Sequence, residues 1–257
     1  MEFLSWKVED GVAILTISRP PANALARALI LEIDEALTAL KEDDAVRVIL
    51  LHGEGRFFSA GADIKEFTGV SSAEEFTKLA ENGQQVFERL ETFPKPVIAA
   101  IHGAALGGGL ELAMSCHLRY VTETAKLGLP ELQLGIIPGF AGTQRLPRYV
   151  GMAKAAEMMF TSEPISGAEA VQWGLANAAF PEEELLESVV AIAKKIAKKS
   201  PIALRETLAA LQYAKTASFH EGVKAEAASF GTIFVSEDAK EGISAFIEKR
   251  EPVFNGK

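Results

Sequence analysis

The chain has 257 residues, of which 48% are hydrophobic, and this is enough apolar material for one large domain. Its formal net charge of −9 argues against a nucleic-acid-binding protein, because such proteins normally carry a clustered basic face. A single cysteine, Cys116, excludes an internal disulfide, and the absence of a basic-then-apolar leader or of an apolar run of about 20 residues predicts a cytoplasmic protein that does not insert into membranes.

Strand-like and helix-like patterns alternate up to about residue 180. Short apolar runs predict strands over residues 12–17, 47–52, 97–101 and 118–122. Amphipathic or glycine-bounded stretches between these runs predict helices over residues 24–40, 73–91 and 110–116. Alternation of this kind is typical of a layered α/β domain.

From Pro181 onward the sequence is almost wholly helical. Helices are predicted over residues 182–199, 201–216, 219–235 and 238–249. Their faces are rich in alanine and carry few large side chains, so each helix alone would bury little apolar surface. We therefore predict an α/β core with the active site over residues 1–195 and a C-terminal helical oligomerisation region over residues 196–257, packed on the core, on another subunit, or on both.

Three loops rich in small residues follow the predicted strands, at residues 57–65, 102–111 and 126–143. Loops at one edge of an α/β sheet are a usual place for ligands. The small residues at Ala60, Ala62 and 107–109 allow two backbone N–H groups to point at one oxygen atom, as in an oxyanion hole. Glu111 and Glu131 stand in the second and third loops, where paired carboxylates favour acid–base chemistry, although two solvated surface glutamates would give the same pattern.

Motifs of other enzyme classes do not match. A dinucleotide-binding fingerprint counted from Gly107 lacks its third glycine, and a P-loop counted from Gly103 lacks its lysine. Ser59 lacks the first glycine of a nucleophile elbow. The four histidines show no metal-ligand spacing, so no metal site is predicted, and His102 and His117 are expected to be buried and hydrogen-bonded.

Several segments, in the right order, resemble the crotonase (enoyl-CoA hydratase/isomerase) family. They are Arg19-Pro20 with Ala22-Asn23-Ala24-Leu25, Ser59 to Glu66, His102 to Glu111, Pro130 to Leu146, and Ala245 to Arg250. The likeness runs from about residue 10 to the C-terminus. It implies an α/β crotonase-like (ClpP/crotonase) fold, a spiral of repeated β-β-α units with a C-terminal helical region. It also implies homotrimers, commonly paired into homohexamers.

The resemblance also implies roles for individual residues. The N–H groups of Ala62 and Gly108 would form the oxyanion hole for a thioester carbonyl, and Glu111 and Glu131 would be the catalytic acid–base pair. Glu111 would orient or activate a water molecule, and Glu131 would be the main proton donor. Contacts to the CoA substrate are implied for Ala24, Ala60, Ala62, Asp63, Ile64, Lys65 and Gly108, with Phe246 and Lys249 reaching the nucleotide end of CoA bound in a neighbouring subunit.

Retention of both glutamates distinguishes activities within the family. Its isomerases, dehalogenases and hydrolases usually replace one or both, so this chain resembles a hydratase. The expected reaction is syn addition of water to trans-2-enoyl-CoA in fatty-acid or related acyl-CoA catabolism, with no cofactor beyond the coenzyme A of the substrate. Ala26 and Phe140-Ala141 depart from the usual family pattern; the second departure narrows the expected acyl pocket and leaves the chain-length preference open. Asp63 is also interpreted as structural, capping the helix that follows.

Three other functions remain open. A glycoside hydrolase also uses two carboxylates, but two Trp and three Tyr are few for sugar platforms. An enoyl-CoA isomerase or another CoA-thioester enzyme of the family would need only one acid–base group. A catalytically silent scaffold or RNA-binding relative fits poorly with the intact glutamate pair and the acidic charge balance.

Overall fold

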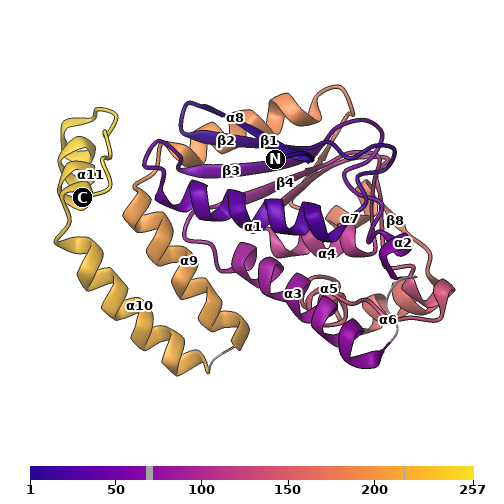
Figure 1. Ribbon diagram of the computed structural model, residues 1–257. Helices are drawn as coiled ribbons and strands as arrows, with labels where there is room; N and C mark the ends of the chain where they lie inside the picture. Colours follow the sequence, from indigo (N-terminus) through magenta and orange to yellow (C-terminus); the bar gives the residue numbers. More distant parts are fainter. Residues whose placement is uncertain (68–71, 217) are drawn as a thin grey trace.

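Figure 1 shows the computed structural model, which describes residues 1–67, 72–216 and 218–257. A six-stranded sheet lies at its centre, in the order β1-β2-β3-β4-β6-β9. Its strands are β1 (Leu4–Glu9), β2 (Val12–Ile17), β3 (Val48–Gly53), β4 (Val97–Ile101), β6 (Leu118–Thr122) and β9 (Ala178–Phe180). The β1–β2 pair is antiparallel, and every other neighbouring pair in this sheet is parallel.

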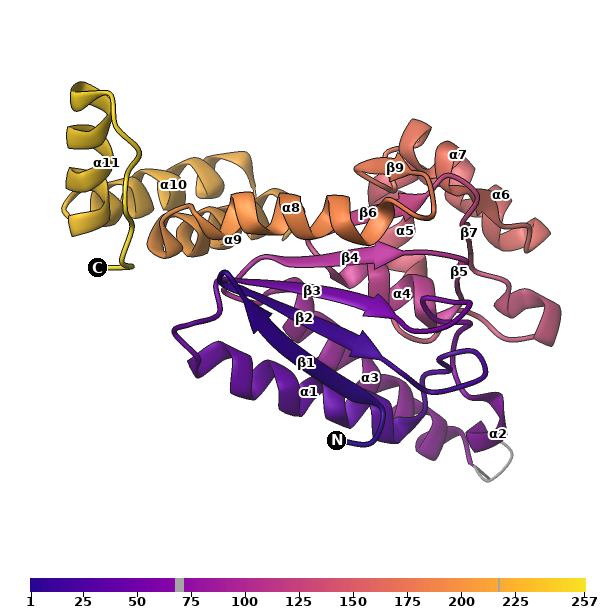
Figure 2. The same ribbon diagram turned by 90° about the horizontal axis from the view of Figure 1, so that it is seen from above.

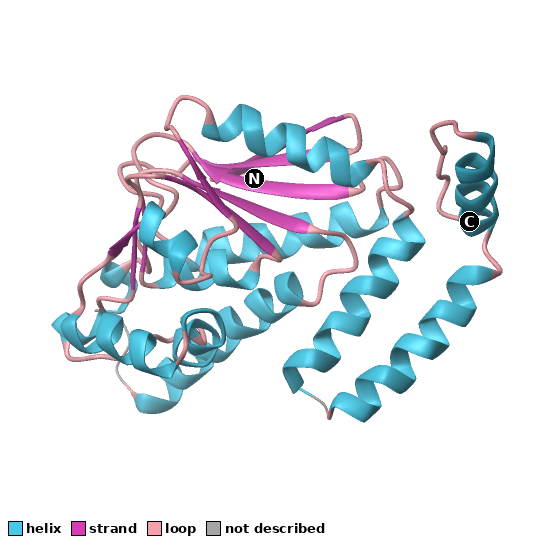
Figure 3. Cartoon of the chain, turned by 180° about the vertical axis from the view of Figure 1, so that it is seen from behind, coloured by secondary structure: helices cyan, strands magenta, loops and turns pink. Residues whose placement is uncertain are grey.

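A smaller sheet stands beside the large one, as Figure 3 shows from behind. It has the order β5-β7-β8, formed by β5 (Ala104–Leu106), β7 (Lys126–Gly128) and β8 (Ile165–Ser166). The helices are α1 (Arg27–Glu42), α2 (Ile64–Phe67), α3 (Ala73–Glu91), α4 (Gly108–Ser115), the 3₁₀ helix η1 (Glu131–Leu134), α5 (Gly142–Val150), α6 (Met152–Thr161), α7 (Gly167–Gln172), α8 (Leu185–Ala197), α9 (Pro201–Thr216), α10 (Phe219–Phe234) and α11 (Glu237–Glu248).

The chain winds through the two sheets as a spiral. One strand of the large sheet is followed by a short strand of the small sheet and then by a helix, as in β4-β5-α4 and β6-β7-η1. Gly103 makes the turn between β4 and β5 with a φ of +61°, and a Cβ at this position would lie only 1.8 Å from the Arg56 carbonyl oxygen. Only glycine fits this turn, which leads the chain from β4 in the large sheet to β5 in the small sheet.

Both faces of the large sheet are covered by helices, as Figure 2 shows from above. Successive side chains of a strand point to opposite faces, so adjacent residues enter different cores. Facing the side of α1, α3 and α4 are Leu15, Leu51 and Ala99, and facing α8 are Ile14, Leu50 and Ile98. Burial on both faces explains why these strands are nearly continuous apolar runs.

Many predicted elements are confirmed, including the strands at 12–17, 97–101 and 118–122 and the helices at 73–91 and 201–216. The predicted helix at 24–40 begins later, at Arg27, because Asn23 has a left-handed φ of +52° and Ala26 is extended. The helix predicted from Leu110 begins two residues earlier, at Gly108. Strand β1 was not predicted, although Leu4, Trp6 and Val8 alternate with polar residues as in a strand; only Leu4 of these residues is buried.

Helices α9, α10 and α11 extend away from the core, as Figures 1 and 2 show. In the single chain they expose large apolar side chains, among them Leu211, Phe219, Phe230, Phe234 and Phe246. Helix α8, in contrast, packs on β2, β3 and β4. The division into a core over 1–195 and an oligomerisation region over 196–257 stays a prediction. Within the described residues, no helix is both long and apolar enough to cross a membrane.

Candidate active site

Two backbone nitrogens, those of Ala62 and Gly108, face the same small volume. A Cβ on Gly108 would lie 3.3 Å from the Ala62 nitrogen, and a Cβ on Gly61 would lie 3.7 Å from the Gly108 nitrogen. Gly108 is the first residue of α4, where N–H groups have no acceptor within the helix. The pair therefore has the geometry of an oxyanion hole.

The loop that carries Ala62 is held against the turn before α1. The Leu25 N–H donates to the Gly61 carbonyl at 2.8 Å, and the Asp63 N–H donates to the Leu25 carbonyl at 3.1 Å. These two bonds lie on either side of Ala62 and orient its peptide. The conformation of this loop thus depends on hydrogen bonds with the segment around Leu25, which lies far away in the sequence.

Asn23 anchors that turn from the inside. Its side chain donates to the carbonyls of Glu54 at 2.9 Å and Phe57 at 2.7 Å, and accepts from the Arg19 N–H at 2.9 Å. The Ser59 hydroxyl donates to the Asn23 carbonyl at 2.8 Å. Only 2% of Asn23 is exposed, so its polar groups form hydrogen bonds within the protein in place of hydrogen bonds to water.

Replacing Asn23 with alanine is expected to lower the free energy of unfolding by about 2–4 kcal/mol. Each buried group left without a partner costs roughly 1–3 kcal/mol, and alanine tolerates a positive φ poorly. Urea denaturation measures the loss, and Asn82→Ala on the exposed face of α3 is the control, expected to stay within about 0.5 kcal/mol. Equal stability of the two variants would contradict the anchoring role.

Glu111 lies in the first turn of α4 and is 1% exposed. Its Oε1 accepts the N–H groups of Phe140 at 2.8 Å and Gly142 at 2.7 Å. Burial, reinforced by the negative charge of Glu131, raises the pKa of Glu111 to about 7. A carboxyl with this pKa is ready to accept or release a proton near neutral pH.

Glu131 begins the 3₁₀ helix that follows β7. Its Oε2 is buried and has no hydrogen-bond partner among the described residues. A Cβ on Gly107 would lie 2.9 Å from the Glu131 Oε1, so this carboxylate rests against the glycine run that opens α4. Burial raises the pKa of Glu131 as well. An unpartnered buried carboxyl oxygen is poised to interact with a ligand.

Both carboxylates and both backbone donors line one cavity of about 500 Å³. Its lining includes the predicted residues Ala60, Ala62, Ile64, Gly108, Glu111 and Glu131. The remaining walls are mostly apolar, with Leu79, Ile136 and Phe140 among them. The structure thus brings these six predicted residues together around one cavity.

Other predicted residues lie beside the cavity. Asp63 accepts from the Arg19 guanidinium at 2.6 Å and from the Lys65 N–H at 3.1 Å, so it caps α2 as predicted. Hydrogen bonds from Arg19, with the attraction of its charge, lower the pKa of Asp63. Arg19 also donates to the Ala24 carbonyl at 3.1 Å. Ala24, Asp63 and Lys65 are not among the residues lining the cavity, and their contacts with CoA stay predictions.

Phe246 and Lys249 are not brought to the cavity within one chain. Both lie on or at the end of α11, on the side of the molecule opposite α2, as Figure 2 shows. Phe246 is 85% exposed. The expectation that they serve the site of a neighbouring subunit stays a prediction.

The histidines and the cysteine have structural positions. The Nδ1 of His117 accepts from the Val97 N–H at 2.9 Å, and burial lowers the pKa of His117 to about 4. The Nε2 of half-buried His102 lies 2.8 Å from the Gly55 carbonyl oxygen. Cys116 is buried, which raises its pKa to about 12, so it is a packed side chain. Among the described residues no group of three or more His, Cys, Asp or Glu is arranged to hold a metal ion.

Arg145 lies behind the cavity wall and supports it, although the sequence pattern assigned this residue no role. Its side chain is 6% exposed; its Nε donates to Glu91 at 2.8 Å and a second nitrogen donates to the Phe140 carbonyl at 2.8 Å. Phe140 is one of the residues whose N–H holds Glu111. Lys215 of α9 also donates to Glu91, at 2.9 Å. Burial would raise the pKa of Glu91, but hydrogen bonds from Lys215 and Arg145 hold it below its ordinary value.

Replacing Arg145 with methionine is expected to lower the free energy of unfolding by about 2–3 kcal/mol, because hydrogen bonds to charged groups contribute about 1.5–3 kcal/mol each. Arg148→Met is a matched control. Arg148 is 46% exposed and lies 3.7 Å from the same Glu91, so its loss should cost less than about 1 kcal/mol. Thermal denaturation of the two variants measures the difference. Equal melting temperatures would rule out this role for Arg145.

Two backbone donors in an oxyanion-hole arrangement, beside the buried Glu111 and the half-buried Glu131, fit an enzyme site for acid–base chemistry on a carbonyl compound. The sequence matches the model of the family described as enoyl-CoA hydratase/isomerase over residues 7–257, and the chain belongs to this family. This confirms the family and the crotonase-like fold class predicted from the sequence.

Relatives and solved structures agree with this assignment. The chain is 58% identical to a probable enoyl-CoA hydratase of Bacillus subtilis over 100% of both chains. It is 44% identical to the crotonyl-CoA hydratase of Syntrophomonas wolfei, covering 97% of this chain and 96% of the relative. The crystal structure of an enoyl-CoA hydratase from Bacillus anthracis superimposes with a TM-score of 0.94 at 38% identity, covering 99% of each chain.

Proposed function

We propose that this protein adds water to the double bond of trans-2-enoyl-CoA thioesters and forms 3-hydroxyacyl-CoA. The observation that carries the proposal is that Glu111 and Glu131 line the same cavity as Ala62 and Gly108. One carboxyl would suffice to move a proton along a substrate, whereas two can hold a water molecule between them. The hydratase names of similar proteins support the same reaction.

The thioester carbonyl oxygen accepts the N–H groups of Ala62 and Gly108. As water adds at Cβ, negative charge develops on this oxygen as an enolate, and the two donors stabilise it by roughly 3–4 kcal/mol each. The donors are fixed before the reaction by the helix start and by the bonds on either side of Ala62. The hole thus needs little reorganisation when charge develops.

The two carboxyls divide the proton transfers. Glu111 acts in its ionised form: one oxygen is held by two N–H groups, and the other accepts a proton from the water as its oxygen bonds to Cβ. Glu131 acts in its neutral form and gives its proton to Cα. Transfer of the proton from Glu111 to Glu131 then restores both groups. Because the two charges interact, the pair titrates as a coupled unit.

The remaining parts of the proposal concern CoA and assembly. Ala24, Ala60, Asp63, Ile64 and Lys65 are proposed to contact CoA of the same subunit. Phe246 and Lys249 are proposed to contact CoA of a neighbour in a trimer or hexamer. The exposed apolar side chains of α9 to α11 support such an assembly, because they would otherwise stay in water. Hydration transfers no electrons, so the proposal includes no cofactor beyond the CoA of the substrate.

Adding the protein to crotonyl-CoA tests the function. Loss of the conjugated enoyl-thioester absorbance, with formation of a single 3-hydroxybutyryl-CoA stereoisomer, is the expected result. Isomerisation of a 3-enoyl-CoA without net hydration would instead favour the isomerase alternative. No absorbance change with substrates of several chain lengths would contradict the proposal.

A further inference from the structure

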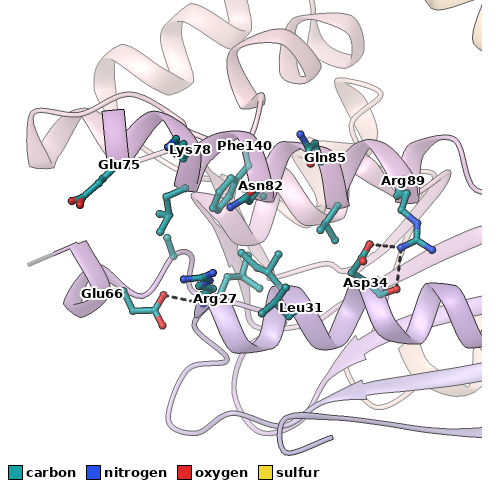
Figure 4. Close-up of a pocket in the computed structure, with 16 residues that line it drawn as sticks. Arg27, Leu31, Asp34, Glu66, Glu75, Lys78, Asn82, Gln85, Arg89 and Phe140 are labelled. Atoms are coloured by element: carbon teal, nitrogen blue, oxygen red, sulfur yellow. Dashed lines mark hydrogen bonds and ion pairs between the residues drawn. The ribbon is translucent and has the colours of Figure 1, made fainter. Parts of the chain in front are cut away.

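Phe140 stands between two cavities. The catalytic cavity of about 500 Å³ adjoins a second cavity of about 820 Å³ that forms a groove between α1 and α3. Figure 4 shows this groove, with Arg27, Leu31 and Asp34 on α1, Lys78 to Arg89 on α3, and Phe140 beside α3. Among the described residues, the two linings share Ala62, Leu79 and Phe140. Phe140 is the aromatic member of this set.

The ring of Phe140 spans the space between Gly108 and Gly83, and it lines both cavities. A Cβ on Gly108 would lie 3.3 Å from its Cδ2, and a Cβ on Gly83 would lie 2.3 Å from its Cε1. Gly108 belongs to the oxyanion hole and Gly83 to the middle of α3. The ring also packs against Phe87, with 5.2 Å between centroids. It is 5% exposed and therefore firmly placed.

The direction of the acyl chain follows from the position of Glu111. The reacting carbons lie next to Glu111, whose carboxylate is held by the N–H of Phe140. The bulky, anionic CoA needs the open side of the cavity. On that side Glu131 is half-buried and Ile136 is exposed. The apolar end of the acyl group then extends inward, and its next carbons meet the Phe140 ring.

We propose that Phe140 limits the length of the acyl chain and makes this protein selective for short enoyl groups. The inference rests on the proposed hydration of enoyl-CoA and names the substrate class within it. Beyond the ring, Leu25, Ile30 and Val86 form the apolar wall of a groove whose rim is polar, and this wall is the part that a longer chain would contact. Gly83 makes room for the Phe140 ring, because any side chain at position 83 would collide with it.

The test compares kcat/KM for C4, C6, C8 and C10 trans-2-enoyl-CoA in wild type, Phe140→Ala and Phe140→Leu. Opening the passage should raise the ratio of C8 to C4 activity at least about 10-fold in Phe140→Ala, since a methylene in an apolar pocket changes selectivity by about 10-fold or more. Phe140→Leu should give a smaller change in the same direction. The ratio is independent of the folded fraction, so partial loss of stability does not obscure it.

Phe93→Ala is the matched control. Phe93 is as buried as Phe140, at 3% exposed, but lines neither cavity, so its replacement should leave the ratio unchanged. A wild type that hydrates C8 as well as C4, or an unchanged ratio in Phe140→Ala, would overturn the inference while leaving hydration itself established. A wild type inactive on all four substrates would overturn the proposed function instead.

Gly83→Ala gives a second, steric test. Alanine is the better helix former by roughly 1 kcal/mol, but its Cβ would collide with Phe140. The substitution should therefore lower the melting temperature in the wild-type background and raise or preserve it in Phe140→Ala. An equal effect in both backgrounds would show that the ring does not occupy the passage.

Discussion

Replacing Glu131 with glutamine is expected to lower turnover of crotonyl-CoA by at least about 100-fold, the low end of the contribution of a general acid or base. Glutamine keeps the shape of the side chain but has no carboxyl proton to deliver to Cα. The affinity for a CoA ester should change little, because the oxyanion donors and the cavity walls remain. Stopped-flow absorbance measures turnover, and calorimetry with 3-hydroxybutyryl-CoA measures binding.

The control for this prediction is Glu123→Gln. Glu123 is exposed and follows β6, so it carries the same change of charge without reaching the cavity. Its activity should match that of the wild type. Near-normal hydration by Glu131→Gln would remove Glu131 from the mechanism.

Replacing Glu111 with glutamine is expected to have opposite effects on activity and stability. Turnover should fall by at least about 100-fold, because an amide cannot accept the proton of the water. In wild type, activity should decline as the pH falls through about 7, the pKa of Glu111, because the carboxyl then becomes protonated. Glu111→Gln should lose this limb of the pH profile.

The stability effect follows from the direction of the pKa shift. Folding raises the pKa of Glu111 from 4.5 to about 7, so the folded state binds the proton more tightly. The resulting stability is fully present below pH 4.5 and is lost as the pH rises through about 7. At about 1.4 kcal/mol per pKa unit, the loss amounts to roughly 3 kcal/mol.

Glu111→Gln avoids this loss, because the amide carries no charge and its oxygen can still accept from Phe140 and Gly142. The variant should therefore be more stable than wild type at pH 8 by up to roughly 3 kcal/mol, with little difference at pH 4. Denaturation at both pH values measures the gain. A variant that is less stable than wild type at pH 8 would contradict burial of a charged Glu111 as the cause.

Local signals in the sequence were sufficient for the main strands and for placing Glu111 beside the N–H donors of a helix start. The strands at 12–17 and 97–101 are buried on both faces, and such strands appear as continuous apolar runs. Glu111 follows a glycine run that begins a helix, and this pattern marks N–H donors and a carboxylate within one turn. For these features, neighbours in the sequence are also neighbours in the site.

Other elements left no readable pattern. The strands β5, β7 and β8 have only two or three residues, which is too few to show a period. The boundary of α1 was wrong because Asn23 is held in a left-handed turn by Glu54 and Phe57, more than 30 residues away. Helix propensity alone would start α1 at Ala24, whereas the tertiary hydrogen bonds delay its start to Arg27.

The sequence by itself determined the α/β class, the family resemblance and the pair of glutamates, because these depend on residue type and short spacing. Only the tertiary structure decided how the pair is tuned and what encloses it. Arg145 meets Glu91 across 54 residues, and Phe140 fills the space left by Gly83, because folding joins segments with no local relation. The raised pKa of Glu111 likewise arises from burial and from Glu131, which are properties of the folded chain.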